Sequence, residues 1–154
     1  MALSFSKINW HGRIFRYVPL FVVIAMILFA STTQASMSKT SRIIRPLLEF
    51  LFPQTPEPTL VIYHGYIRKF AHFAEYAVLG FFASRAFWHS KKKSLRENWY
   101  LAAFALVLIV ASFDELNQSF NPSRTGSVND VLLDCFGGAF LIGSLMFYKK
   151  IGND

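Results

Sequence analysis

The residues best suited to do chemistry lie between Ser112 and Gly138. This stretch separates two apolar segments, one from Leu101 to Phe113 and one that resumes at Val131. Between them the chain carries more polar side chains than a turn between lipid-facing helices needs: Asp114, Glu115, Asn117, Gln118, Arg124, Asn129, Asp130 and Asp134. An aspartate at the centre of a membrane helix costs roughly 2.5–3.5 kcal/mol, so such residues usually pair, face the interior of a bundle and serve a function. We therefore expect the functional site in this stretch.

Helical spacing assigns these polar groups to faces. One face before the turn holds Ser112, Glu115, Gln118 and Ser119. On the same helix, Asp114 points well away from Glu115, since successive residues differ in direction by about 100°. After the turn, Asp130, Asp134 and Gly137 align at intervals of four and three residues. The glycine pair that begins at Gly137 leaves room for a close neighbouring helix, which is a structural role.

A second set of polar side chains opens the apolar segment at about 66–88, which reads IRKFAHFAEYAVLG from Ile67. The members of this set that fall within about a third of the helix circumference are Lys69, His72, Glu75 and Tyr76. A solvated helix end with paired charges would also carry such a stripe. The stripe continues past the first turn, however, and we interpret it as one wall of the site.

Composition indicates an all-α, polytopic integral membrane protein. Of the 154 residues, 53% are hydrophobic and 16% are charged, and the apolar residues form long runs instead of the short alternating runs of a soluble core. The runs predict four transmembrane helices, at about 15–33, 66–88, 99–118 and 129–147, within a single domain over residues 1–154. The one cysteine, Cys135, excludes an internal disulfide framework.

The N-terminal third leaves alternatives open. Residues 15–33 could be a cleaved signal peptide with an apolar core from Val18 to Ala30, but the stretch is long enough to span and we prefer a retained helix. Next, residues 41–53 place two arginines beside leucine and phenylalanine, and Pro46 suits the start of a short helix. We expect an interfacial element there, lying on the membrane surface. The run PQTPEP that follows predicts a stiff, polar break.

The distribution of basic residues predicts the orientation. Ten of the 16 lysines and arginines lie in the N-terminus, at Arg85, in the loop after the second span and in the tail. The strongest cluster among them is Lys91, Lys92, Lys93 and Arg96. The positive-inside rule then makes both termini and this loop cytoplasmic, so the polar ends of the last three spans meet at the extracytoplasmic face. The net charge of +7 reflects this orientation and attraction to anionic lipids, and we expect no nucleic-acid partner.

Two segments, RKFAHFAEYAVLG and FDELNQSFNPSRTGSVNDVLLDCFGG, resemble the VanZ-like family of small bacterial membrane proteins. The shared pattern is Lys-x-x-His-Phe-x-Glu-Tyr, then Asp-Glu-x-x-Gln-x-x-x-Pro-x-Arg, then an aspartate and a glycine-rich helix. The signature residues are Lys69, His72, Glu75, Tyr76, Glu115, Gln118, Arg124 and Asp130. This chain has Asp134 where the family usually has Asn, which adds a negative charge or a protonated carboxyl to the site.

The resemblance covers residues 67–143 well and the first span weakly. It implies a four-helix, multi-pass domain in the bacterial cytoplasmic (inner) membrane. It also implies a link to resistance against teicoplanin-type glycopeptide antibiotics, and so a role in the cell envelope.

One function that fits these residues is binding of membrane lipids. The ligand would be an anionic phospholipid or a lipid-linked cell-wall precursor at the outer leaflet. The ligand-binding residues would be Arg68, Lys69, Tyr76, Gln118 and Arg124. The cations would hold a phosphate or carboxylate, and Gln118 and Tyr76 would donate hydrogen bonds. The carboxylates would orient the cations and offset their burial.

A second function is an intramembrane enzyme. The candidate catalytic residues are His72, Glu75, Glu115, Asp130 and Asp134. The first two could supply acid and base. The series Ser123-Arg124, five residues, Asp130, three residues, Asp134 is similar to the third motif of the type 2 phosphatidic-acid phosphatase superfamily, with Asp130 in place of the nucleophilic histidine. The other motifs of that superfamily are missing, but an aspartate beside Arg124 could attack a lipid phosphate.

A third possibility is a metal site. Glu115, Asp130, Asp134 and His72 could bind Zn²⁺, or Mg²⁺ without the histidine. No tight ligand motif such as His-x-x-x-His supports a particular metal, and the cofactor stays unknown at this point. The alternative without a ligand is a network of salt bridges that fixes the register of the helices.

Overall fold

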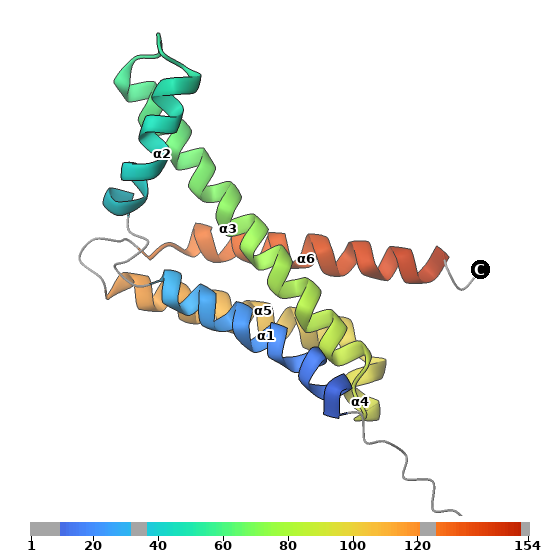
Figure 1. Ribbon diagram of the computed structural model, residues 1–154. Helices are drawn as coiled ribbons and strands as arrows, with labels where there is room; N and C mark the ends of the chain where they lie inside the picture. The colour runs from blue at the N-terminus through green and yellow to red at the C-terminus, as the bar shows by residue number, and fades with distance from the viewer. Residues whose placement is uncertain (1–9, 32–36, 121–125, 152–154) are drawn as a thin grey trace, which may run out of the picture.

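The computed structural model describes residues 10–31, 37–120 and 126–151, and the regular elements within these ranges are all helices. They are α1 (Trp10–Ala30), α2 (Met37–Leu51), α3 (Glu57–Trp88), α4 (Lys93–Glu97), α5 (Trp99–Ser119) and α6 (Val128–Ile151), as labelled in Figure 1. The predicted all-α class is therefore confirmed.

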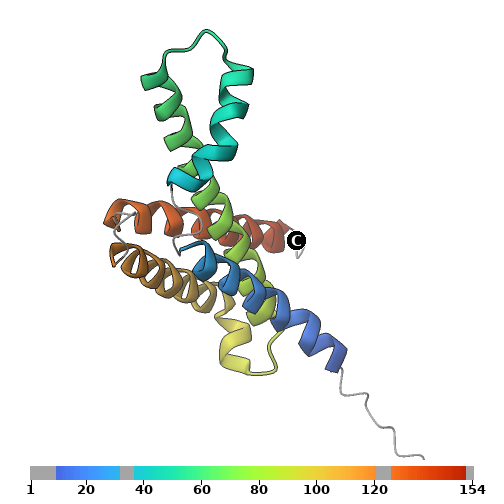
Figure 2. The same ribbon diagram turned by 60° about the vertical axis from the view of Figure 1, so that its left-hand side comes forward.

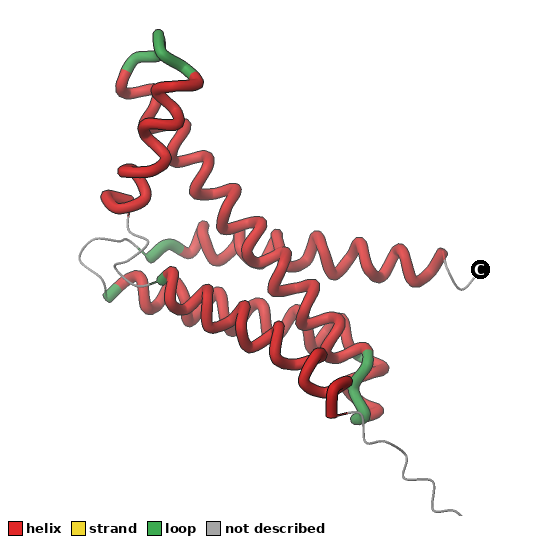
Figure 3. Tube along the Cα trace, in the orientation of Figure 1, coloured by secondary structure: helices red, strands yellow, loops and turns green. Residues whose placement is uncertain are grey.

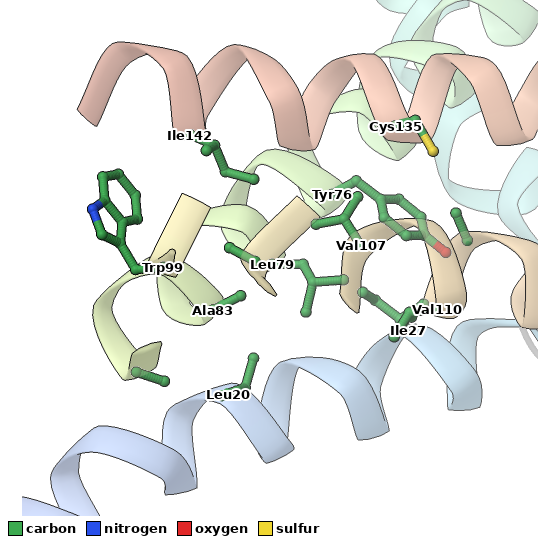
Figure 4. Packing of buried hydrophobic residues seen from close by; sticks show 13 residues of the cluster. Leu20, Ile27, Tyr76, Leu79, Ala83, Trp99, Val107, Val110, Cys135 and Ile142 are labelled. Carbon is green, nitrogen blue, oxygen red and sulfur yellow. The ribbon is translucent and has the colours of Figure 1, made fainter. Parts of the chain in front are cut away.

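The central helix of the bundle is α3. It packs against α1, α2, α5 and α6, and its contact with α6 is the most extensive in the molecule. Figures 1 and 2 show that α3 crosses α5 and α6 obliquely. The core at this crossing includes Tyr76 and Leu79 of α3, Val107 of α5, Ile27 of α1 and Ile142 of α6 (Figure 4). Helix α1 therefore contributes to this core.

Glycines allow the close contact between α3 and α6. A Cβ atom on Gly80 would lie 2.9 Å from the carbonyl oxygen of Gly138, and one on Gly137 would overlap the carbonyl group of Phe73. The two backbones can meet here only because these positions carry no side chain. The predicted role of the glycine pair is confirmed.

Two of the described helices are long and apolar enough to cross a membrane. These are α5 and α6, with 21 and 24 residues. The apolar part of α1, Ile14–Ala30, is shorter. Helix α3 has 32 residues, or about 48 Å at 1.5 Å per residue, and its first half carries several polar side chains. Spans through α1 and α3 stay a prediction.

The helix that contains the second predicted span begins before that span, because α3 starts at Glu57 and not near residue 66. Pro56 is its N-cap and Pro58 lies in its first turn. Proline is tolerated there, since the first N–H groups of a helix have no partner within it. The PQTPEP run is therefore both a break and a helix start.

Helix α2 and the first turns of α3 form a hairpin that projects to one side of the bundle (Figures 1 and 3). Arg45 of α2 joins the two helices through an ion pair with Glu57 of α3, with 2.8 Å between Nη2 and Oε2. Its Nε atom also lies 2.8 Å from Oε1 of Glu49 within α2. A helix is present where the interfacial element was predicted, with exposed apolar side chains such as Phe50, and its place on a membrane surface stays a prediction. Pro46 lies inside α2 and not at its start. A proline within a helix removes one internal hydrogen bond and can kink the helix without ending it.

Candidate functional site

Four side chains from three helices meet in the bundle: His72 of α3, Asp114 and Glu115 of α5, and Asp134 of α6. One nitrogen or oxygen atom from each lies within 4.8 Å of those of the other three. The carboxylate residues are 3%, 5% and 0% exposed, in that order, and His72 is half-buried. We call these four residues the acidic–histidine cluster.

The contact between α3 and α6 positions His72 against Asp134. Asp134 lies one turn before the glycine pair of α6, where the two backbones meet. Its Oδ1 atom is consequently 3.3 Å from Nδ1 of His72. Tyr76 follows one turn later on α3 and is fully buried, with its ring in the core (Figure 4). The polar stripe of α3 therefore turns inward at this level, as predicted.

Helix α5 contributes two adjacent acids, which differ in direction around the helix as their spacing predicts. Both lie on one buried face together with Ala111 and Gln118, and α5 packs against both α3 and α6. Asp114 interacts with His72 and Tyr76 of α3, whereas Glu115 accepts a hydrogen bond from the N–H group of Ser127 at the start of α6. Both acids lie on this buried face, so both reach the cluster.

Each of the two acids of α5 has one oxygen that accepts a hydrogen bond and one that does not. The Nε2 atom of Gln118 donates to Oδ2 of Asp114 at 3.0 Å, and the Ser127 N–H donates to Oε2 of Glu115 at 2.8 Å. The other oxygens, Oδ1 of Asp114 and Oε1 of Glu115, have no hydrogen-bond partner among the described residues. Oδ2 of Asp134 has no such partner either, while its Oδ1 atom faces His72 Nδ1.

The electrostatics of the cluster are unfavourable as it stands. Two like charges about 4 Å apart repel by about 4 kcal/mol at an effective dielectric constant near 20. Within the described parts of the chain, the one basic group of the cluster is His72. Unpaired buried charges are strongly destabilising, so the cluster requires bound protons or a cation.

The structure brings together three of the predicted catalytic residues and leaves two outside the cluster. His72, Glu115 and Asp134 are members. Glu75 is half-buried and interacts electrostatically with His72. Asp130 is half-buried in the first turn of α6 and is not a member.

The predicted ligand-binding residues also divide. Gln118 is buried and touches the cluster through Asp114, and Tyr76 lies beside it. Arg68 is half-buried and Lys69 is exposed, both about one turn before His72 on α3. Arg124, like Ser123, falls outside the described residues.

One member of the cluster, Asp114, was missing from the predicted site residues. Its spacing of four residues from Gln118 was the available signal, because side chains at this spacing lie one above the other on a helix. That spacing predicts the hydrogen bond observed between the two side chains.

A family model decides the wider identity. The VanZ/LLP1 model matches residues 16–149, from α1 to the last turn of α6. The chain belongs to the VanZ/LLP1 family. The comparisons with curated proteins and with solved structures found no match.

The match to the VanZ/LLP1 family confirms the predicted resemblance and includes all members of the acidic–histidine cluster. Together with the two long apolar helices α5 and α6, it indicates a membrane protein.

Proposed function

We propose that this VanZ/LLP1 protein binds the anionic head group of a membrane lipid or lipid-linked cell-envelope precursor at the acidic–histidine cluster. The supporting observation is that three buried carboxylate oxygens of the cluster, one from each acid, lack hydrogen-bond partners among the described residues. A network that served only to fix helix register would satisfy its own polar atoms. Ionisable residues within membrane helices mark ligand and ion pathways, with their partners close by.

The basic residues near the cluster would hold the acidic part of the ligand. Arg68 and Lys69 lie about one turn outward of His72 on α3. An arginine can bind a phosphate or carboxylate with two parallel hydrogen bonds. The unpaired carboxylate oxygens would accept hydrogen bonds from hydroxyl or amine groups of the same head group. The site would therefore prefer ligands that carry both an acidic group and hydrogen-bond donors.

In our proposal this site faces the extracytoplasmic side, and the distribution of lysines and arginines supports that orientation. The cluster lies at the middle of α3, near the end of α5 and near the start of α6, and it is remote from the loop with Lys91, Lys92 and Lys93. That loop would be cytoplasmic by the positive-inside rule. A site on the outer side could bind a lipid-linked cell-wall precursor, which would account for the link to teicoplanin-type resistance implied by the resemblance.

Native mass spectrometry of the purified full chain with its co-purified lipids tests the proposal. We expect a retained anionic lipid. The double variant Arg68→Gln/Lys69→Gln should reduce the bound fraction about tenfold, because one charge-assisted hydrogen bond contributes about 1.5–3 kcal/mol. The matched control is Lys91→Gln/Lys92→Gln, at the other end of the bundle, which should retain the lipid. A lipid-free wild-type protein, or equal retention by both double variants, would contradict the proposal.

Hydrolysis of a lipid phosphate is a second candidate function. The observation that favours it is the 3.3 Å distance between His72 Nδ1 and Asp134 Oδ1, since a carboxylate beside an imidazole orients it as a general base. Phosphate release from a short-chain lipid phosphate in detergent should then fall at least a hundredfold in His72→Gln, as general-base catalysis contributes about 10²–10⁴. Asp130→Asn should leave the rate unchanged in this version of the reaction and abolish it if Asp130 is the nucleophile.

A further inference from the structure

We infer that the acidic–histidine cluster binds one divalent transition-metal cation, with zinc as the best fit. The ligands are one nitrogen of His72 and one oxygen each from Asp114, Glu115 and Asp134. The inference adds an ion to the site proposed above and does not depend on a lipid being bound there.

The distances suit a single small cation. Ligand atoms about 2.0 Å from a tetrahedral zinc ion lie about 3.3 Å from one another. His72 Nδ1 and Asp134 Oδ1 are already 3.3 Å apart. The atoms of all four residues lie within 4.8 Å of one another, so rotations of the two acids on α5 are enough to complete the set.

The carboxylate oxygens without hydrogen-bond partners are a second observation that supports a ligand, in addition to the gathering of three acids at one place. Asp134 is fully buried, and its Oδ2 atom has no hydrogen-bond partner in the described part of the chain, while its Oδ1 atom faces His72 Nδ1. Oδ1 of Asp114 and Oε1 of Glu115, two acids that are also more than nine-tenths buried, have no such partner either. A divalent cation would satisfy these acceptors and would lower the formal charge of three ionised carboxylates from −3 to −1.

The hydrogen bonds around the cluster are those that metal ligands usually receive. Gln118 donates to Oδ2 of Asp114, and the Ser127 N–H donates to Oε2 of Glu115. In each case the second oxygen is left for the ion. Such outer hydrogen bonds orient metal ligands, and their loss typically weakens metal binding by about 10–100-fold.

The donor set indicates the class of metal. An imidazole nitrogen favours zinc and other transition metals over magnesium and calcium, which prefer oxygen ligands and retain several waters. Four protein ligands and no open position would make the site structural, whereas a water in place of one carboxylate would make it reactive.

The test uses the full chain in detergent, without a polyhistidine tag, stripped with EDTA and titrated with ZnCl₂ and, for comparison, MgCl₂. We expect about one zinc per chain by calorimetry and by elemental analysis, with magnesium bound at least about a hundredfold more weakly. Asp134→Asn should abolish zinc binding. The matched control on the same face of α6, Asp130→Asn, should bind zinc as the wild type does.

A further variant keeps the inference falsifiable if Asp134→Asn fails to fold. Gln118→Ala retains all four ligands and should weaken zinc binding by about 10–100-fold. Zinc binding that is unchanged in both variants, or a wild-type protein that binds no zinc, would overturn the inference. A protein that binds lipid without zinc would leave the proposed function intact, whereas one that binds zinc without lipid would overturn the proposed function alone.

Discussion

The two ends of the bundle formed by α3, α5 and α6 differ in charge and in exposure. The acidic–histidine cluster lies at one end, inside the bundle. At the other end, 15 or 16 residues along each helix, the Trp88 and Trp99 rings stack at 5.2 Å and the Lys149 ammonium lies 4.7 Å from the Trp88 ring centre. An open pocket of about 750 Å³ there is lined by Trp88, His89, Ser90, Lys91, Arg96, Glu97 and Lys149.

The comparison shows that charge alone does not identify a ligand site. The lysines and arginine at the tryptophan end are exposed or reach the pocket, so water and lipid head groups can neutralise them. Tryptophan and basic residues together are also the usual composition of a membrane interface. At the cluster end, three acids are buried, and each has an oxygen without a hydrogen-bond partner among the described residues. Burial without partners is the property on which the proposed ligands rest.

The largest expected effect comes from separating α3 and α6 near the cluster. In Gly137→Ala the new methyl group would overlap the Phe73 carbonyl, which cannot move without its helix. We expect a loss of about 1–3 kcal/mol in the free energy of unfolding, typical of overpacking, and weaker zinc binding. The control Gly143→Ala, on the same helix with open space around it, should change neither. Equal melting temperatures for the two variants would show that the close contact is not required.

An intermediate effect is expected from removing one charge of the cluster in the metal-free protein. Asp134→Asn keeps the shape of the side chain and removes one of the repelling carboxylates. We expect the EDTA-treated variant to be more stable than the EDTA-treated wild type by about 1–2 kcal/mol, since proton binding limits the repulsion that is relieved. Thermal unfolding with and without ZnCl₂ measures this difference. A less stable metal-free variant would indicate that the His72–Asp134 pair is stabilising by itself.

The smallest effect is expected at the tryptophan end. Lys149→Gln removes the cation from the face of Trp88, and such contacts contribute about 0.5–1 kcal/mol at exposed sites. The melting temperature should fall slightly, and zinc and lipid binding at the cluster should not change. If Lys149→Gln altered lipid retention as strongly as Arg68→Gln/Lys69→Gln, the lipid would be binding at both ends and the comparison drawn above would fail.

Much of the cluster was predictable from residue spacing. The interval from His72 to Tyr76 predicts a polar stripe on α3, and both residues turn toward the cluster. The interval between Asp134 and the glycine pair predicts an acid one turn from a close helix contact, and this is observed. Asp130 was grouped with Asp134 by the same rule, but it lies in the first turn of α6 and outside the cluster. The spacing of residues gives the direction of a side chain around the helix axis, but it does not show whether that side chain is level with the cluster along the axis.

The sequence by itself determined the helical class, the long apolar helices, the family and the majority of the cluster, because these depend on local periodicity and on residue types. The tertiary structure decided that Asp114 joins Glu115 in the cluster and that α3 begins at Glu57. Periodicity gives the angle between two side chains on one helix, but it does not say which neighbouring helix covers each side. Helix α5 packs against both α3 and α6, and the face that it buries between them is wide enough to include two adjacent acids.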